Sequence, residues 1–389
     1  MEALDLRIAH PPSEMLPSGE ELMAWAGSFA SNRAGLDLVG YGEHAGLGEA
    51  RIAIAEWLTT AYAGKWEPSG LELVLCAGVS GGISVCACGL HTWLADGSQM
   101  GSVALVEGHT YELAPPILEG AGLEVVRVRS DQDGVDPEAV EAEVRKRGGA
   151  GGGPGAVRLL YLVPVHGNPT GATLSPARRA KLIALSQELR FYIVTDEVYG
   201  LLGFGSTPPC PLSASASGSI VSLGSVSKLL APGLRVGWIH CPDNELRKFL
   251  ADVPVAISGG SPVPALAAAA VAGAAEDGCL VKRTESARLL LADRARALTT
   301  ALDAVLEGTG ARLWPCTGGY FLWIELPSVE IASEVAACLE KGDPCVLVGV
   351  LENAAGLRLC FAGLSCEDLG IAAELIGSAV RLTEVALSR

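Results

Sequence analysis

Short apolar runs alternate with amphipathic stretches between about residue 71 and residue 240. An apolar run bounded by turn residues is typical of a buried strand, and apolar positions three or four residues apart are typical of a helix. The predicted strands are residues 71–76, 102–107, 124–128, 158–163, 192–195, 220–223 and 236–240, and the predicted helices are 83–94, 112–120, 137–146 and 175–189. This alternation predicts an α/β fold with a mainly parallel seven-stranded sheet that is sandwiched by helices.

The pattern changes near residue 281. A long charged helical stretch through residue 301 is followed by a strand-like segment at 320–326, a helix near 331–340 and a strand at 356–362. This order predicts a smaller α+β domain. The first 40 residues are too short to fold alone, so we expect them to pack on that domain. The predicted parts are an N-terminal segment 1–40, a large domain 41–280 and a small domain 281–389, made of both termini.

Composition narrows the function classes. The chain has 389 residues, 49% of them hydrophobic, and a net charge of −16. A membrane helix needs about 20 unbroken apolar residues, and the sequence has no such run. The first residues also lack the basic and apolar regions of a signal peptide, so we expect a cytoplasmic protein without a membrane partner. The negative charge, without a Lys/Arg cluster, argues against nucleic-acid binding.

The 11 cysteines do not predict a metal site. They are scattered, and the one close pair, Cys86 and Cys88, lies on a predicted helix, where positions two apart face away from each other. We therefore expect reduced thiols that pack as small apolar side chains, and no bound metal.

Ligands of open parallel sheets bind beyond the carboxyl ends of the strands, and a glycine-rich turn follows the first strand. Residues 78–82 read Gly-Val-Ser-Gly-Gly and enter a helix, whose N-terminal N–H groups can hold an anion. The same residues match the nucleophile elbow of serine hydrolases, with Ser80 as nucleophile and Asp196 and His240 following in the required order. Both interpretations stay open on these residues alone.

Polar side chains follow several other strands. Tyr111 lies shortly after the second strand, and Asn168 lies in a turn after the fourth. Asp196 ends the fifth strand and is followed by Tyr199. An acid at a strand end is commonly a helix cap, but a carboxylate in a cleft can also pair with a protonated heterocyclic nitrogen.

A lysine and two arginines stand in apolar or glycine-rich surroundings. Lys228 has an apolar run on one side and small residues on the other, so it could be desolvated and act as an amine nucleophile. Ser225 and Lys228 also match a β-lactamase pattern, but its later Lys-Thr-Gly motif does not follow. Arg235 follows closely, and Arg358 lies inside an apolar strand, where it needs either a structural acid or an anionic ligand.

Taken in order, these segments resemble the class I/II aminotransferases, which are fold-type I pyridoxal-phosphate enzymes. The resemblance rests on Asn168-Pro-Thr-Gly171, Asp196-Glu-Val-Tyr199 and the segment from Ser222 to Trp238, which reads Ser-Leu-Gly-Ser-x-Ser-Lys-x-Leu-Ala-Pro-Gly-Leu-Arg-x-Gly-Trp. It extends from residues 40–46 to the strand that holds Arg358. The glycine-rich and aromatic segments look most similar to the broad-specificity aromatic and 2-aminoadipate-type branch.

The resemblance implies pyridoxal 5′-phosphate as cofactor, bound in the large domain, with three catalytic residues. Lys228 is implied to form the Schiff base with the cofactor aldehyde and then to shuttle a proton. Asp196 is implied to pair with the pyridine nitrogen. Tyr199 and Asn168 are implied to hydrogen-bond the phenolic oxygen, and Tyr111 to stack on the ring.

The resemblance also implies how the anionic groups are held. The cofactor phosphate is expected at the amides of Val79 and Ser80, the hydroxyls of Ser225 and Ser227, and the guanidinium of Arg235. Arg358, with Asn168, is expected to bind the substrate carboxylate through two parallel hydrogen bonds. Tyr41 matches a tyrosine that reaches the phosphate of the neighbouring subunit, so a homodimer with shared sites is implied.

The expected function is amino transfer between an amino acid and a 2-oxo acid by a ping-pong route. Two departures from the family pattern concern the pocket. Ala9 stands where a glycine is usual, and a Pro-Gly-x-x-Phe loop is missing between Val346 and Arg358, where the connection is short. His109 also replaces a common proline, with a less obvious effect. The two pocket departures are the ones that bear on the reaction. They leave open another reaction on the same cofactor, such as β-elimination by a C–S lyase, decarboxylation or cyclisation.

Overall fold

The computed structural model describes residues 3–93, 102–149, 153, 155–205, 207–215 and 218–387, and it is built around a seven-stranded sheet of order β2-β10-β9-β8-β7-β3-β4. Strand β10 is antiparallel to both of its neighbours, and the other pairs are parallel. The strands are β2 (Leu73–Cys76), β3 (Val103–Glu107), β4 (Glu124–Val128), β7 (Val157–Leu162), β8 (Tyr192–Asp196), β9 (Ile220–Ser225) and β10 (Gly237–His240). The predicted mainly parallel sheet is confirmed.

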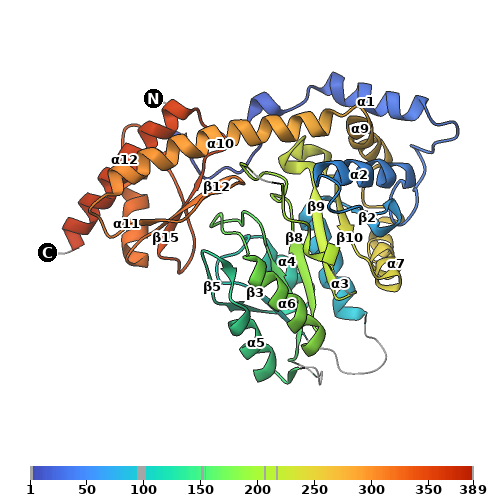
Figure 1. The fold of residues 1–389 in the computed structure, drawn as a ribbon, viewed down its shortest axis with the longest axis horizontal. Helices are drawn as coiled ribbons and strands as arrows, with labels where there is room; N and C mark the ends of the chain where they lie inside the picture. Colours follow the sequence, from blue (N-terminus) through green and yellow to red (C-terminus); the bar gives the residue numbers. More distant parts are fainter. Residues whose placement is uncertain are drawn as a thin grey trace.

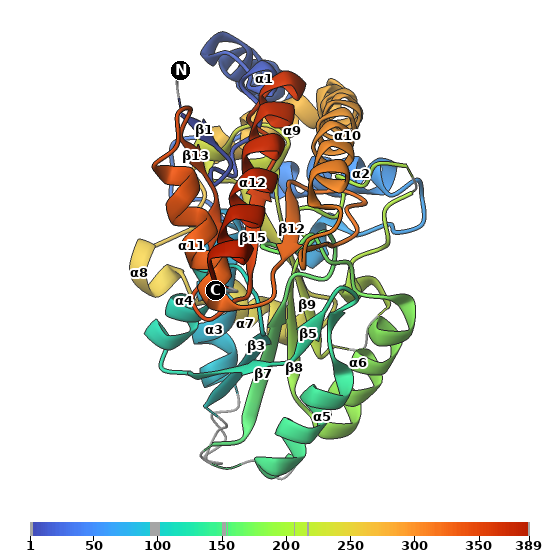
Figure 2. The same ribbon diagram turned by 90° about the vertical axis from the view of Figure 1, so that its left-hand side faces the viewer.

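Helices cover both faces of this sheet, as the alternation of side chains on β7 shows. Leu159 and Tyr161 pack in the core that contains α3 (Gly78–Thr92), whereas Leu160 and Leu162 pack in a second core with α5 (Pro137–Lys146) and α6 (Pro176–Leu189). Figure 2 shows α3 on one side of the strands and α5 and α6 on the other. Strand β7 is therefore apolar on both faces, as expected for a central strand of a buried parallel sheet.

Helix α3 begins earlier than the sequence pattern predicts. The expected start was residue 83, but the helix starts at Gly78; the expected end, Leu94, lies outside the described residues. The glycines of this first turn fit against their neighbours, since a Cβ on Gly82 would lie 3.1 Å from Leu223 and 3.2 Å from the Sγ of Cys76. Close packing thus offsets the weak helix propensity of glycine.

The remaining helices flank the sheet or connect it to the C-terminal part. They are α1 (Gly19–Ser31), α2 (Gly48–Ala61), α4 (Ala114–Gly120), α7 (Asn244–Asp252), α8 (Val255–Ser258), α9 (Ala265–Glu276), α10 (Cys279–Leu306), α11 (Val329–Glu340) and α12 (Cys366–Leu387). Helix α10 runs along the upper edge of the molecule in Figure 1, from beside α9 to α12. None of the helices in the described part of the chain is long and apolar enough to span a bilayer; the cytoplasmic location stays a prediction.

The C-terminal part contains a four-stranded antiparallel sheet of order β11-β12-β15-β14. Its strands are β11 (Arg312–Leu313), β12 (Phe321–Glu325), β14 (Gly349–Val350) and β15 (Gly356–Cys360). The short connection noted before Arg358 is a hairpin, because β14 pairs with β15 directly. Helices α11 and α12 pack against each other beside this sheet.

The N-terminal segment contacts both parts of the chain. Strand β1 (Leu4–Asp5) pairs in parallel with β13 (Val346–Leu347), and the carbonyl of Leu6 accepts a 2.8 Å hydrogen bond from the amide of Cys360. Helix α1 lies instead along α9, within the residues 41–280 that were assigned to the large domain. The division into residues 1–40, 41–280 and 281–389 stays a prediction.

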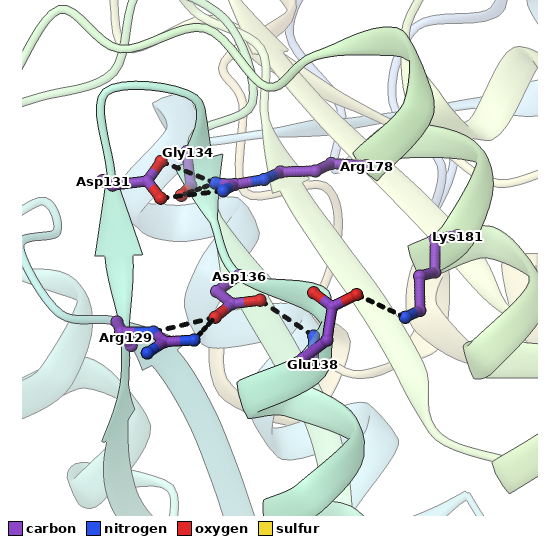
Figure 3. A network of polar contacts seen from close by, with 7 residues as sticks. All are labelled: Arg129, Asp131, Gly134, Asp136, Glu138, Arg178 and Lys181. Atoms are coloured by element: carbon purple, nitrogen blue, oxygen red, sulfur yellow. Dashed lines mark hydrogen bonds and ion pairs between the residues drawn. The ribbon is translucent and has the colours of Figure 1, made fainter.

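A polar network joins α6 to a small hairpin, β5 (Ser130–Asp131) and β6 (Gly134–Val135), as Figure 3 shows. Arg178 donates to both carboxylate oxygens of Asp131, at 2.7 and 2.8 Å, and to the carbonyl of Gly134 at 2.7 Å. Lys181 pairs with Glu138 of α5 at 2.6 Å. Bidentate arginine pairs fix orientation, so the network positions the start of α6, which follows the turn that contains Asn168.

Candidate active site

One cavity of about 240 Å³ lies at the carboxyl ends of the central strands, where they face the C-terminal part. All but one of the predicted site residues line it, which confirms that they come together in space. They are Val79, Ser80, Tyr111, Asn168, Asp196, Tyr199, Ser225, Ser227, Lys228, Arg235 and Arg358. Arg7, Ala9, Glu112, Val198 and Pro232 complete the lining. Tyr41 is not among these residues.

One end of the cavity is a cradle of hydrogen-bond donors. The first turn of α3 has amides without partners inside the helix, and Ser225 and Ser227 face it with their hydroxyls 2.8 Å apart. Arg235 is oriented by a 2.8 Å hydrogen bond from Nη2 to the carbonyl of Ala77. Gly78 has a φ of +69°, and a Cβ there would lie 2.5 Å from Nη2 of Arg235, so only glycine fits. The cradle fits a phosphate group.

Lys228 ends the short turn that follows β9, and its amine points into the cavity. Its Nζ donates a 2.6 Å hydrogen bond to the carbonyl of Ala9, and the hydroxyl of Tyr320 donates a 2.8 Å hydrogen bond to the carbonyl of Lys228. Burial lowers the pKa of Lys228, although the negative charge of Asp196 opposes this. A lower pKa increases the share of neutral amine, which is the nucleophilic form.

Asp196 ends β8 with only 4% of its surface exposed. The hydroxyl of Tyr161 donates to Oδ2 at 3.1 Å, and the amide of Val198 donates to Oδ1 at 3.1 Å. Burial raises the pKa of Asp196 to about 6, and the two hydrogen bonds oppose that rise. The carboxyl is therefore mostly ionised at neutral pH and able to pair with a cation.

Arg358 lies on β15, opposite Trp323 of β12, and faces the cavity. Its Nη1 donates to Oδ1 of Asn168 at 3.2 Å and its Nη2 to the carbonyl of Arg7 at 3.1 Å, while its Nε is buried without a hydrogen-bond partner. Within the described residues it forms no ion pair with a carboxylate. Of the two alternatives drawn from the sequence, the structural acid is thus not found among the described residues, and the anionic ligand stays a prediction.

The tyrosines of the predicted site occupy different positions. The hydroxyl of Tyr111 lies 3.3 Å from that of Ser80, and the buried ring of Tyr199 lies 5.5 Å from the ring of Tyr320. Tyr41 lies outside the cavity with 82% of its surface exposed. Its carbonyl accepts a 3.4 Å hydrogen bond from the amide of Ser261, so the backbone is anchored while the ring faces solvent.

The structure does not assemble the serine hydrolase triad considered for Ser80. His240 is buried, and its Nδ1 lies 2.6 Å from the hydroxyl of Ser213. It lines a different cavity, beside Trp66 and Trp238. The sheet register separates His240 from Ser80. His240 pairs with Ser222, which lies within β9, three residues before the carboxyl end of that strand at Ser225.

Two residues of this region, Tyr161 and Glu107, carry no role that the sequence pattern predicts. Tyr161 stands inside an apolar strand and therefore resembles an ordinary core aromatic. Glu107 ends β3, is buried, and accepts a 2.9 Å hydrogen bond from the amide of Val163. Burial raises the pKa of Glu107 to about 8. An acid directly after an apolar run was the available signal, since acids are rarely buried without a role. His109 does not line the cavity; its ring lies 5.4 Å from that of Trp323.

Comparison with known proteins gives a family match over most of the chain. The family described as "Aminotransferase class I and II" matches residues 16–376. A relative named "Aromatic-amino-acid aminotransferase 1" from Thermococcus litoralis is 27% identical over 74% of this chain and 65% of its own length. The "Uncharacterized HTH-type transcriptional regulator YdfD" from Bacillus subtilis is 28% identical over 86% of this chain and 66% of its own length. The chain thus spans just under two thirds of either relative.

A solved structure agrees with the fold. The structure of LysN, an alpha-aminoadipate aminotransferase from Thermus thermophilus complexed with N-(5′-phosphopyridoxyl)-L-leucine, superposes with a TM-score of 0.80 and 24% identity. The alignment covers 99% of this chain and 93% of that chain. A relative named "2-aminoadipate transaminase" from Thermus thermophilus is 30% identical over 72% of this chain and 70% of its own length. Together with the aromatic-amino-acid relative, it agrees with the branch indicated by the sequence.

The buried carboxyl of Glu107 predicts a pH-dependent stability. Its pKa is raised from 4.5 in the unfolded chain to about 8, so the folded state holds the proton more tightly and loses stability as pH rises between these values. Glu107→Gln removes this titration. We therefore compare the unfolding free energy of the variant with that of the wild type at each pH. As the pH rises from 5 to 9, this difference should shift in favour of the variant by about 2–4 kcal/mol.

Chemical denaturation of the cofactor-free protein at several pH values measures this difference. Glu119→Gln, on the exposed surface of α4, is the matched control and keeps the wild-type pH dependence. Parallel stability curves for Glu107→Gln and the wild type would contradict the prediction.

Proposed function

Because this chain belongs to the class I and II aminotransferase family, we propose that it is a pyridoxal-phosphate-dependent aminotransferase that moves an amino group between an amino acid and a 2-oxo acid by a ping-pong route. The observation that carries the proposal is the set of residues that line one cavity. It brings the amine of Lys228, the buried carboxyl of Asp196 and the guanidinium of Arg358, which pairs with no carboxylate among the described residues, to the same edge of the sheet.

The residues present fit pyridoxal phosphate. The donor cradle formed by α3, Ser225, Ser227 and Arg235 suits its phosphate, and Asp196 suits its protonated ring nitrogen. When bound, the cofactor supplies an aldehyde that captures amines and a ring that withdraws electrons. Lys228 would hold the cofactor covalently at Nζ, and after release would move a proton to and from the substrate Cα.

The substrate carboxylate is assigned to Arg358. A guanidinium can bind both oxygens of a carboxylate in one plane, which an ammonium cannot do. The hydrogen bond to Asn168 orients this guanidinium, so Asn168 serves the substrate as well as the cofactor. Every α-amino acid and every 2-oxo acid carries such a carboxylate, so the same residue can bind donor and acceptor.

Lys228→Ala tests the covalent role of the amine. Borohydride fixes a lysine-bound cofactor irreversibly, so mass spectrometry of the treated wild type should find cofactor on the peptide that contains Lys228. The variant should show no fixed cofactor and should lose activity by about 10²-fold or more, because it lacks its proton-transfer group. Lys282→Ala, on the exposed surface of α10, is the control and keeps both properties.

The products separate transfer from its alternatives. Equal amounts of a new amino acid and a new 2-oxo acid indicate amino transfer, whereas ammonia with pyruvate indicates β-elimination and carbon dioxide indicates decarboxylation. Cofactor fixed equally to the Lys228→Ala protein would overturn the assignment of Lys228. A panel of amino donors mixed with the holoenzyme identifies the substrate side chain.

A second candidate function is suggested by the relative named a transcriptional regulator, which matches 86% of this chain. In that case the cavity senses a cofactor–amino acid complex and the chain is the sensing part of a longer protein. The two candidates differ in turnover. A sensor binds pyridoxal phosphate and an amino acid without releasing products, whereas an enzyme forms many equivalents of 2-oxo acid per site.

Ala9 is expected to restrict the size of the substrate. It lines the cavity, and its carbonyl accepts the hydrogen bond from Lys228. Ala9→Gly removes one methyl group, and one methyl or methylene in a tight pocket changes selectivity by about tenfold. In this variant, we expect the ratio of kcat/KM for a bulky aromatic amino donor to kcat/KM for the amino donor alanine to rise by that factor. A uniform change for all donors would show that the methyl does not contact the side chain.

A homodimer with shared sites accounts for the position of Tyr41. Its backbone is anchored at Ser261 while its ring is exposed, as a residue that serves a neighbouring subunit requires. Coexpressed Lys228→Ala and Tyr41→Ala chains form mixed dimers in which one site has both residues, so random pairing restores about a quarter of wild-type activity. Activity no higher than the average of the two separate variants would mean that Tyr41 does not complete the partner site.

A further inference from the structure

Tyr161 lies behind the candidate cofactor site and contacts the one acid assigned to the cofactor ring. We propose that Tyr161 is a positioning residue whose hydroxyl donates a hydrogen bond to Oδ2 of Asp196 and thereby keeps this carboxyl ionised. The role of Asp196 toward the cofactor ring rests on the function proposed above. The contact between Tyr161 and Asp196 exists in the cofactor-free protein.

The sheet register explains the contact. Tyr161 on β7 pairs with Val194 on β8, and Asp196 lies two residues further along β8, so all three side chains point to the same face. A tyrosine is long enough to reach past Val194 to the end of the strand, where its hydroxyl lies 3.1 Å from Oδ2. Tyr161 is fully buried, with 0% of its surface exposed, so water cannot replace this donor.

The phenol is suited to a purely donating role. Burial raises its pKa far above the usual value, and the negative charges of Asp196 and Glu107 add to the rise, so the hydroxyl keeps its proton at all physiological pH values. A hydrogen bond to the ionised carboxyl stabilises that form. The other titratable groups that act around Asp196 are Glu107, Tyr111, Glu197, Tyr199 and Lys228. Of these, Glu197 raises and Lys228 lowers the pKa of Asp196.

Tyr161→Phe removes the hydroxyl and keeps the ring. We expect the ionisation constant of Asp196 to fall about tenfold, which is the effect of one hydrogen bond to a buried charge. Carboxyl-carbon NMR of the cofactor-free protein measures this constant, with the signal assigned through Asp196→Asn. Tyr192→Phe is the matched control, because Tyr192 starts β8 at the end opposite Asp196, and it should leave the constant unchanged.

Cofactor binding gives a second readout that a loss of packing would not produce. The dissociation constant of pyridoxal phosphate for Tyr161→Phe should be about fivefold higher than for the wild type near pH 6 and should converge with it near pH 9, where Asp196 is ionised in both proteins. A constant offset at every pH would indicate a packing defect and would overturn the proposal. An unchanged ionisation constant of Asp196 would overturn it as well.

The contact between Tyr161 and Asp196 and the proposed cofactor function can be tested separately. A shifted ionisation constant in a protein that binds no pyridoxal phosphate would support the contact and refute the proposed function. If Tyr161→Phe does not fold, 3-fluorotyrosine incorporated at position 161 alone is the alternative, because it keeps the ring and the hydroxyl. Fluorination makes the phenol a stronger donor, so the ionisation constant of Asp196 should rise, and an unchanged constant there would again refute the proposal.

Discussion

The carboxyl group of Asp196 lies out of water at the end of β8, where its ionised form is costly unless hydrogen-bond donors replace the lost water. Two donors do so, the hydroxyl of Tyr161 from the neighbouring strand and the amide of Val198 from the following turn. Each oxygen accepts one of these bonds. The ionised form of Asp196 therefore depends on the parallel pairing of β7 with β8, because this pairing sets the distance between the phenol of Tyr161 and the carboxyl of Asp196.

The same edge of the sheet depends on the first residues of the chain. Three carbonyls of the N-terminal segment accept hydrogen bonds from the C-terminal part and from the turn after β9. The carbonyl of Leu6 accepts from Cys360, that of Arg7 from Arg358 and that of Ala9 from Lys228. The pairing of β1 with β13 fixes this segment upstream. Lys228 and Arg358 are thus oriented in part by neutral carbonyls, which leaves their charge available to an anion.

The strands could be predicted from the sequence because their signals are local, and most of the candidate site could be predicted because short motifs at strand ends resemble those of a known family. Apolar runs between turn residues locate the seven strands, and residues such as Asn168, Asp196 and Lys228 stand at strand ends in short motifs. Tyr161 and Glu107 could not be assigned in this way, because their role depends on which strands are neighbours. An aromatic residue in an apolar strand looks the same whether it faces aliphatic side chains or a buried carboxyl. The packing of α1 along α9 is also a tertiary preference without a local signal.

A net charge of −16 repels anions, whereas the proposed function requires a site for two anionic groups, a phosphate and a carboxylate. Distance resolves this, because charges separated by more than about 8–10 Å are largely screened at physiological ionic strength. The electrostatic interaction of a bound anion is dominated by the nearest donors and charges. These are the amides at the start of α3, the guanidinium of Arg235 and, at the other end of the cavity, the guanidinium of Arg358. The Nε of Arg358 is buried without a partner, so the site already bears the cost of an unmet donor. A ligand that supplied the missing acceptor would recover that cost on binding, which favours carboxylates over neutral molecules of the same shape.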